Sequence, residues 1–341
     1  MDTAWNEIVG HEWAVRLLRE AIARGRVGHA YLFTGPRHVG KTALAIRFAQ
    51  ALNCEVEAAD RRPCGQCRSC RLIAAGRHPD VRVVEPEESS RGHLTLKIEQ
   101  IRDLQQGLSL AAYEARWKIA LLTEFDSATA GAANAFLKTL EEPPNGVALL
   151  LTASEADAVL PTISSRCRVI ALRPLPTGHI ASALEARWQV PVAQAHLLAH
   201  LADGRLGWAL QALEDKSLLT SRGEHLDRLQ EALYGSRVER FELADKLARK
   251  PEELPGILRT WLSWWRDLAL LAWSGTDGAE VGAISNVDAE DDMVSLSRRW
   301  ERASILRALQ QTDRALWQLE HNANTRLALE NLLLVYPRRG V

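Results

Sequence analysis

The chain has 341 residues, a length that favours two or three domains, and its composition, 47% hydrophobic and 25% charged, is typical of a globular protein. Its 42 Lys and Arg residues nearly balance 43 Asp and Glu, which argues against one broad basic surface for nucleic acid; any such contact is expected to be local or shared with other subunits. The first residues lack the basic region and apolar core of a signal peptide and no apolar run reaches membrane-spanning length, so we expect a cytoplasmic protein with reduced thiols and no membrane contact.

Short apolar runs alternate with helical patterns over the first 172 residues. Residues 11–24 are predicted to form an amphipathic helix, because apolar residues recur at three-to-four spacing at Trp13, Leu17, Leu18, Ala21 and Ile22. Strands are predicted at Ala30–Thr34, Val81–Glu85, Lys118–Thr123, Val147–Thr152 and Cys167–Leu172, and helices at Lys41–Leu52, Ile98–Gly107 and Ala128–Glu142. Strands that alternate with helices predict a mostly parallel sheet covered on both faces, as in nucleotide-binding α/β domains.

Helical periodicity takes over after residues 173–176, Arg-Pro-Leu-Pro, and continues to the end of the chain. We therefore predict three domains: an α/β domain at residues 1–172, a small helical domain at 173–215 and a larger helical domain at 216–341. Within the last of these, Thr276–Asp292 is acidic, contains Gly and lacks periodicity, which predicts an exposed loop.

A row of large apolar residues lies at helical spacing in the third predicted domain. Its members are Trp261, Trp264, Trp265, Leu268 and Leu271. A stripe this apolar does not face water. It forms either the core of its own domain or a contact with another protein, since aromatic residues are common in both, and the sequence does not separate the two.

Residues 35–42, Gly-Pro-Arg-His-Val-Gly-Lys-Thr, fit the phosphate-loop pattern G-x-x-x-x-G-K-[ST] between a predicted strand and a predicted helix. Gly35 and Gly40 let the backbone curl so that its N–H groups converge on phosphate oxygens. Lys41 is predicted to bind the β- and γ-phosphates, and the hydroxyl of Thr42 to coordinate Mg²⁺. The pattern predicts a site for ATP or ADP with Mg²⁺, the alternative being a loop that persists only as a structural turn.

Hydrolysis of ATP needs two further groups, an acid that holds Mg²⁺ and a base that orients water, usually as Asp-Glu after a buried strand. Here the apolar residues 119–122 are followed by Thr123 in the position of the acid and Glu124 in that of the base. If Asp126 is taken as the acid instead, Ser127 falls in the position of the base. Because a neutral hydroxyl cannot offset the charge of Mg²⁺ as a carboxylate does, hydrolysis is expected to be weak or absent.

Four of the five cysteines cluster in the sequence. Cys54, Cys64, Cys67 and Cys70 form the pattern C-x9-C-x2-C-x2-C. Four thiolates satisfy the tetrahedral coordination of Zn²⁺ and leave no open position for catalysis. We therefore predict a structural zinc knuckle at residues 54–70, with vestigial or redox-active thiols as the alternative.

Arg166 lies in a polar turn, residues 161–167, before the last predicted strand. A guanidinium at the edge of such a sheet could reach the γ-phosphate bound to a neighbouring subunit and supply charge in trans. From the residues alone, a solvated or salt-bridged surface Arg is the more common role for this position.

Together these motifs resemble the clamp-loader branch of the AAA+ family. The resemblance rests on residues 29–36, the four-cysteine knuckle, Ser165-Arg166-Cys167 and the block at 134–144, Asn-Ala-Phe-Leu-Lys-Thr-Leu-Glu-Glu-Pro-Pro, in the order and spacing of the family over about residues 5–172. It implies an AAA+ P-loop domain with a parallel sheet and an inserted zinc knuckle. A small helical lid at 173–215 and an all-α oligomerisation collar at 216–341 are implied to follow.

Two subunit types of that family carry the knuckle, the motor (gamma or tau) and the delta-prime type. The motor has Asp-Glu eleven residues before the Asn of the block, where this chain has Thr123. It also has a sensor Arg in the third lid helix, where this chain has Gly207, with Arg205 nearby. Both departures favour the delta-prime type, whereas the intact phosphate loop weakly favours the motor.

The resemblance implies a stator in a hetero-pentamer with gamma/tau motor and delta subunits, which contributes Arg166 as an arginine finger to a neighbour's ATP site. That complex, part of the DNA polymerase III holoenzyme, loads a sliding clamp onto primed DNA in replication. Two alternatives are an ATP-hydrolysing gamma/tau-type motor, which Thr123 disfavours, and another AAA+ DNA-remodelling ATPase, which the 134–144 block disfavours. Whether this chain is itself an enzyme stays open between them.

Overall fold

The computed structural model describes residues 4–88, 94–273, 284–320 and 323–338. The chain divides into two compact units, each described here by itself: Met1–Ala183 with Gly204–Gly207, and Leu184–Asp203 with Trp208–Val341. The three domain boundaries expected from the sequence remain predictions. Within the described ranges, no helix is long and apolar enough to cross a membrane.

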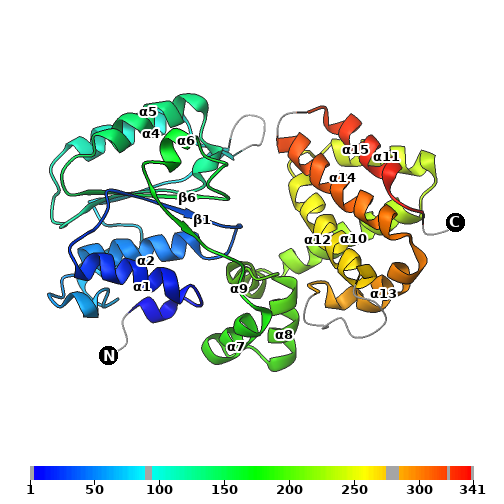
Figure 1. Ribbon diagram of the computed structural model, residues 1–341, viewed down its shortest axis with the longest axis horizontal. Coiled ribbons are helices and arrows are strands. Elements are labelled where there is room, and N and C mark those ends of the chain that lie inside the picture. The colour runs from blue at the N-terminus through cyan, green and yellow to red at the C-terminus, as the bar shows by residue number, and fades with distance from the viewer. Residues whose placement is uncertain (1–3, 89–93, 274–283, 321–322, 339–341) are drawn as a thin grey trace. The chain divides into compact units, whose positions relative to one another are not determined.

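Five strands of the first unit form the predicted parallel sheet, in the order β2-β5-β6-β1-β7 (Figure 1). In chain order they are β1 (Ala30–Thr34), β2 (Val81–Val84), β5 (Lys118–Leu122), β6 (Val147–Ala153) and β7 (Arg168–Ala171). Each end lies within one residue of its predicted position; β1, β5 and β6 are buried apolar runs, whereas most residues of the edge strands β2 and β7 are not buried. A short antiparallel pair, β3 (Glu87–Glu88) and β4 (Leu94–Thr95), was not predicted.

The two faces of the sheet carry separate hydrophobic cores. Tyr31 and Phe33 pack with helices α1 and α2 on one face, and Leu32, between them in sequence, packs with α4 and α5 on the other (Figure 1). The α-helices that lie within this unit are α1 (Glu12–Ala23), α2 (Lys41–Asn53), α3 (Arg68–Ala74), α4 (Ile98–Ser109), α5 (Ala130–Glu141) and α6 (Pro161–Ser164), with 3₁₀ turns at Ala4–Glu7, Ala59–Arg61 and Phe125–Ser127. This arrangement confirms the α/β fold expected from the alternation of strands and helices.

The buried face of α1 is narrower than predicted. Leu18 and Ala21 are buried together with Ala14, whereas Trp13 and Leu17 are 45% and 46% exposed. Ala14 and Leu18 belong to the core on this face of the sheet and Val15 and Ile22 pack against it partly buried, so the buried face is turned away from Trp13 and Leu17; three-to-four spacing alone does not say which edge of a wide apolar face is buried.

The second unit is helical. Two helices, α7 (Thr177–Trp188) and α9 (Leu206–Glu214), contain residues of both units. The others are α8 (Val192–Leu201), α10 (Ser217–Tyr234), α11 (Arg237–Ala248), α12 (Leu254–Trp273), α13 (Glu290–Arg299), α14 (Arg302–Glu320) and α15 (Thr325–Val335), with a 3₁₀ turn at Val287–Ala289.

The aromatic stripe of α12 is the core of this helical unit. Trp261, Trp264 and Trp265 are all 0% exposed. The ring of Trp265 lies 5.0 Å, centroid to centroid, from both Trp264 and Tyr336, so residues at the end of the chain close over the stripe. Of the two interpretations left open by the sequence, the structure supports the intradomain core.

The predicted exposed loop at 276–292 is wrong for residues 284–286 and from Glu290 onward. Residues 276–283 lie outside the described ranges, but Ile284, Ser285 and Asn286 are buried, and α13 begins at Glu290. The cause is the buried carboxylate of Asp267, whose Oδ2 accepts hydrogen bonds from the amides of Ser285 and Asn286, each at 2.8 Å. Polar residues satisfied in this way by an internal partner are not visible as buried in a hydrophobic pattern.

Candidate nucleotide and metal sites

The phosphate loop joins the end of β1 to the start of α2. Gly35 and Gly40 both have positive φ, +140° and +111°, and a Cβ at position 35 would lie 2.4 Å from the carbonyl oxygen of Leu172. The two glycines are therefore required by the path of the backbone. Lys41 and Thr42 follow in the first turn of α2, where the leading N–H groups have no acceptor within the helix.

Lys41 is held inside the loop. Its ammonium donates to the carbonyl oxygens of Gly35 at 2.5 Å and Pro36 at 2.9 Å, and the residue is 9% exposed. Burial lowers the pKa of Lys41, and the carboxylates of Asp126 and Glu124 oppose that shift. The loop thus presents one partly desolvated cation next to the amides of a helix start, an arrangement that suits a polyphosphate.

The end of β5 carries no free pair of carboxylates in the described structure. Thr123 is buried, with its amide bonded to the carbonyl of Val84 at 3.0 Å. Glu124 forms an ion pair with Arg37 of the phosphate loop. The Oδ2 of Asp126 accepts hydrogen bonds from the amide and hydroxyl of Ser154, at 2.9 and 2.5 Å. Both acids flank the loop, but each is already engaged by a neighbouring group.

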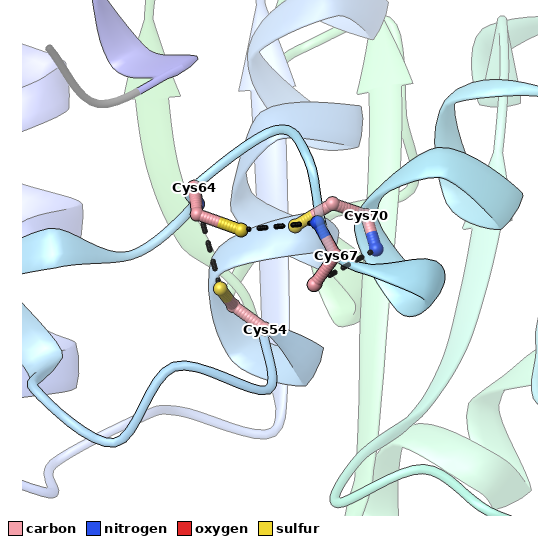
Figure 2. Close-up of side chains that lie close together, drawn as sticks. All are labelled: Cys54, Cys64, Cys67 and Cys70. Carbon is pink, nitrogen blue, oxygen red and sulfur yellow. Dashed lines mark hydrogen bonds between the residues drawn. The ribbon is translucent and has the colours of Figure 1, made fainter.

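The four predicted cysteines come together between the end of α2, at Cys54, and the first turn of α3, which contains Cys70 (Figure 2). Their sulfur atoms all lie within 4.8 Å of one another. The amide of Cys64 donates to the sulfur of Cys54, and the amide of Cys70 to that of Cys67, each at 3.4 Å. Amides that point at sulfur atoms stabilise thiolates, so these four side chains fit a tetrahedral metal ion.

The pKa values of the thiols follow the same geometry. Burial raises the pKa of Cys54 and that of Cys70 above the usual range. For Cys64 burial acts in the same direction, but hydrogen bonds from the amides of Cys67 and Gln66 outweigh it and lower the pKa to about 7. Of Cys54, Cys64 and Cys70, Cys64 is therefore the thiol that gives up its proton most readily. A metal ion held by these four side chains would support local folding, because all four ligands come from the protein.

Arg166 and the phosphate loop lie at opposite ends of the parallel strands. The loop follows the carboxyl end of β1, whereas Arg166 precedes the amino end of β7, and the two strands pair in parallel with Tyr31 opposite Arg168. Its guanidinium donates to the carbonyl of Thr162 and to Oε1 of Glu141, both at 2.8 Å. Arg166 therefore cannot serve the phosphate loop of its own chain.

Two contacts at these sites were missed by sequence reasoning. The sequence indicated that Glu141 was of interest only through its place in the Glu-Glu-Pro-Pro block. Nothing in that block indicated that Glu141 would pair with Arg166. Gly207 was interpreted only as the absence of a sensor Arg. In the structure its amide donates to the carbonyl of His38 in the phosphate loop, at 2.9 Å.

Comparisons with known proteins agree with this architecture. The family described as "DNA polymerase III, delta subunit" matches residues 10–176. The chain is 40% identical over 166 residues to the DNA polymerase III subunit delta' of Pseudomonas aeruginosa (49% of each chain) and 34% identical over 204 residues to the delta' subunit of Bacillus subtilis (60% of each). It is 35% identical over 235 residues to the tau subunit of Escherichia coli, which is 67% of this chain and 35% of tau. The chain belongs to the clamp-loader family of AAA+ proteins.

The family resemblance expected from the sequence is thereby confirmed. The chain spans 35% to 60% of the length of these clamp-loader relatives. Because relatives of the delta' and tau types both match, the comparisons identify the clamp-loader family and leave the subunit type open. The four-cysteine cluster and the phosphate loop both lie within the matched residues.

Proposed function

We propose that this chain is a delta-prime-type subunit of the DNA polymerase III clamp loader. In this role it is a stator, assembled with gamma/tau motor and delta subunits, that supports ATP-driven loading of a sliding clamp onto primed DNA. The observation that carries the proposal is the strand end after β5. Thr123 is buried where hydrolysis requires a carboxylate, and the adjacent Glu124 is tied to Arg37.

Arg166 supports the same role, because it would act as an arginine finger at the ATP site of a neighbouring motor subunit. Charge builds on the γ-phosphate oxygens in the transition state, and a guanidinium held there stabilises it more than it stabilises bound ATP. The position of Arg166 at the sheet edge away from its own phosphate loop favours action on another subunit. The side chain is 38% exposed and thus accessible to a partner.

The phosphate loop supports binding of ATP or ADP without rapid turnover. Gly35, Gly40, Lys41 and the helix start would hold the phosphates, and the hydroxyl of Thr42 would contact the accompanying Mg²⁺. Cys54, Cys64, Cys67 and Cys70 would hold Zn²⁺ as a structural ion.

The gamma/tau-type motor is the second candidate, favoured by the intact phosphate loop and by the match to tau. An ATPase assay of the purified chain, alone and reconstituted with gamma/tau and delta subunits, separates the two. The proposal expects turnover by the chain alone far below about 1 s⁻¹, and clamp loading by the complex. Robust hydrolysis by the chain alone would show that it is the motor.

A further inference from the structure

A backbone contact that excludes any side chain joins Gly207 to the phosphate loop. The amide of Gly207 donates to the carbonyl of His38. A Cβ at position 207 would lie 2.8 Å from that oxygen and 3.3 Å from the Cα of His38. Glycine is thus required for the contact, because a larger residue would push the loop and the start of α9 apart.

A second glycine fixes the other end of the same short segment. The carbonyl of Gly204 accepts from the amide of Leu175 at 2.8 Å, and a Cβ at Gly204 would lie 2.3 Å from the Cβ of Pro174. Residues 204–207 are therefore held on the first unit at both ends by contacts between backbones.

His11, at the start of α1, contacts the next carbonyl of the loop, that of Val39. Its Nε2 lies 3.1 Å from the carbonyl oxygen of Val39, and the residue is buried. Because a carbonyl oxygen only accepts hydrogen bonds, the ring of His11 donates to it through Nε2–H. Two successive carbonyls of the phosphate loop, those of His38 and Val39, are thus anchored from outside the loop.

The direction of these carbonyls sets the direction of the amides. A trans peptide unit is planar, so its C=O and N–H point to opposite sides. Anchoring the carbonyls of His38 and Val39 turns the amides of Val39 and Gly40 the other way. The amide of Val39 does face the carbonyl of Pro36, at 3.4 Å, which also accepts from the ammonium of Lys41. The amide of Val39 is thus used inside the loop, so the donor that the two anchored carbonyls would direct toward an anion is the amide of Gly40, next to the start of α2.

We propose that Gly207 and His11 are positioning residues for phosphate binding. By hydrogen-bonding to the carbonyls of His38 and Val39, they orient the backbone of the loop for a polyphosphate. The inference rests on the proposed function in taking the polyphosphate to be that of ADP or ATP. The coupling is reciprocal. If the contacts of Gly207 and His11 strengthen phosphate binding, bound phosphate strengthens these contacts by the same free energy.

The test compares the whole chain with three variants, Gly207→Ala, His11→Phe and Gly178→Ala. Phe keeps an aromatic ring at position 11 and removes the donor. Gly178 is the matched control, because it lies in the first turn of α7 with no atom within 4 Å of its added Cβ. In calorimetric titration with ADP, Gly207→Ala and His11→Phe are expected to bind about fivefold or more weakly than wild type, and Gly178→Ala as tightly.

Amide hydrogen exchange of the peptide that covers residues 36–40, measured without nucleotide, provides a readout that does not depend on ADP. Exchange is expected to be faster in Gly207→Ala and His11→Phe and unchanged in Gly178→Ala. Unchanged exchange in the first two variants, or undiminished affinity for ADP, would overturn the proposal. If the wild type binds no ADP, the nucleotide assignment fails, and the exchange comparison still decides whether these contacts hold the loop.

Discussion

Arg166 and Glu141 form an ion pair, 2.8 Å from Nη2 to Oε1, between the turn before β7 and the last turn of α5. Both side chains are more than a third exposed, at 38% and 51%, and a pair so exposed adds little to the stability of the fold. The ion pair instead orients the guanidinium of Arg166. Its Nη2 is held by Glu141 and its Nη1 by the carbonyl of Thr162. A guanidinium held at two points loses less entropy when it meets a partner.

Replacement of Arg166 separates an arginine finger from an ordinary surface residue. We expect Arg166→Ala to leave the chain folded and able to assemble with gamma/tau and delta subunits. Clamp loading should fall, and ATP hydrolysis by the complex should fall partly, because fingers are worth about 10³–10⁵ in rate but only one site would depend on this chain under the proposed function. Arg166→Lys should rescue poorly, since Lys lacks the planar fork.

The matched control for that experiment is Glu141→Gln, which keeps the shape of the side chain and removes the charge. It is expected to lower clamp loading less than Arg166→Ala, because Arg166 retains its bond to Thr162. Assembly is checked first by size-exclusion chromatography. Unchanged loading and hydrolysis in a fully assembled Arg166→Ala complex would contradict the finger role.

Metal analysis tests the cysteine cluster. Protein purified without chelator is expected to contain one Zn²⁺ per chain, and Cys67→Ala to lose it. Structural zinc sites contribute about 10–16 kcal/mol of apparent binding energy in small domains, so the loss should unfold the loop between α2 and α3 locally. Cys167→Ala is the control, because Cys167 lies outside the cluster and burial raises its pKa to about 12. Absence of stoichiometric zinc from the wild type would exclude the site.

The acid position after β5 is tested by Thr123→Asp. A carboxylate there is expected to strengthen Mg²⁺-dependent binding of ATP, because it would offset the metal charge as Thr123 cannot. Hydrolysis is expected to stay slow, since Glu124 remains paired with Arg37. The double variant Thr123→Asp with Arg37→Ala releases Glu124 and should hydrolyse faster than either single variant. Equal Mg²⁺ dependence in wild type and Thr123→Asp would show that position 123 does not face the metal.

The sheet was predictable because its strands are local apolar runs bounded by turn residues. The phosphate loop and the cysteine cluster were predictable for a related reason: each is a local motif whose chemistry fixes its spacing. The partners of Arg166 and Gly207 were not, because Glu141 and His38 are distant in sequence and are brought near only by the finished fold. The same limit explains the buried turn at 284–286, which depends on Asp267.

A last prediction concerns Asp80, a buried carboxylate outside both sites. Its oxygens accept hydrogen bonds from the amides of Tyr113, Glu114 and Ala115, at 2.8, 2.8 and 2.9 Å, and so hold the loop before β5. Burial alone would raise the pKa of Asp80, but these three amides outweigh it and lower the pKa below the ordinary value. A carboxyl with a depressed pKa stabilises the fold above its unfolded pKa, about 3.9, and that stabilisation is lost as pH falls through the lower folded pKa.

Asp80→Asn is therefore expected to destabilise the chain by about 1–3 kcal/mol at pH 7, because its NH₂ group would face amides that need an acceptor. The difference from wild type should shrink as the pH falls below about 4, because the carboxyl of the unfolded wild type binds a proton first and that of the folded wild type follows only at its lower pKa. Urea unfolding followed by circular dichroism at pH 7 and at pH 3 measures both effects. Asp157→Asn, at an exposed position, is the control and should behave as wild type at both pH values. A penalty for Asp80→Asn that is the same at both pH values would show that the charge of Asp80 is not what holds the loop.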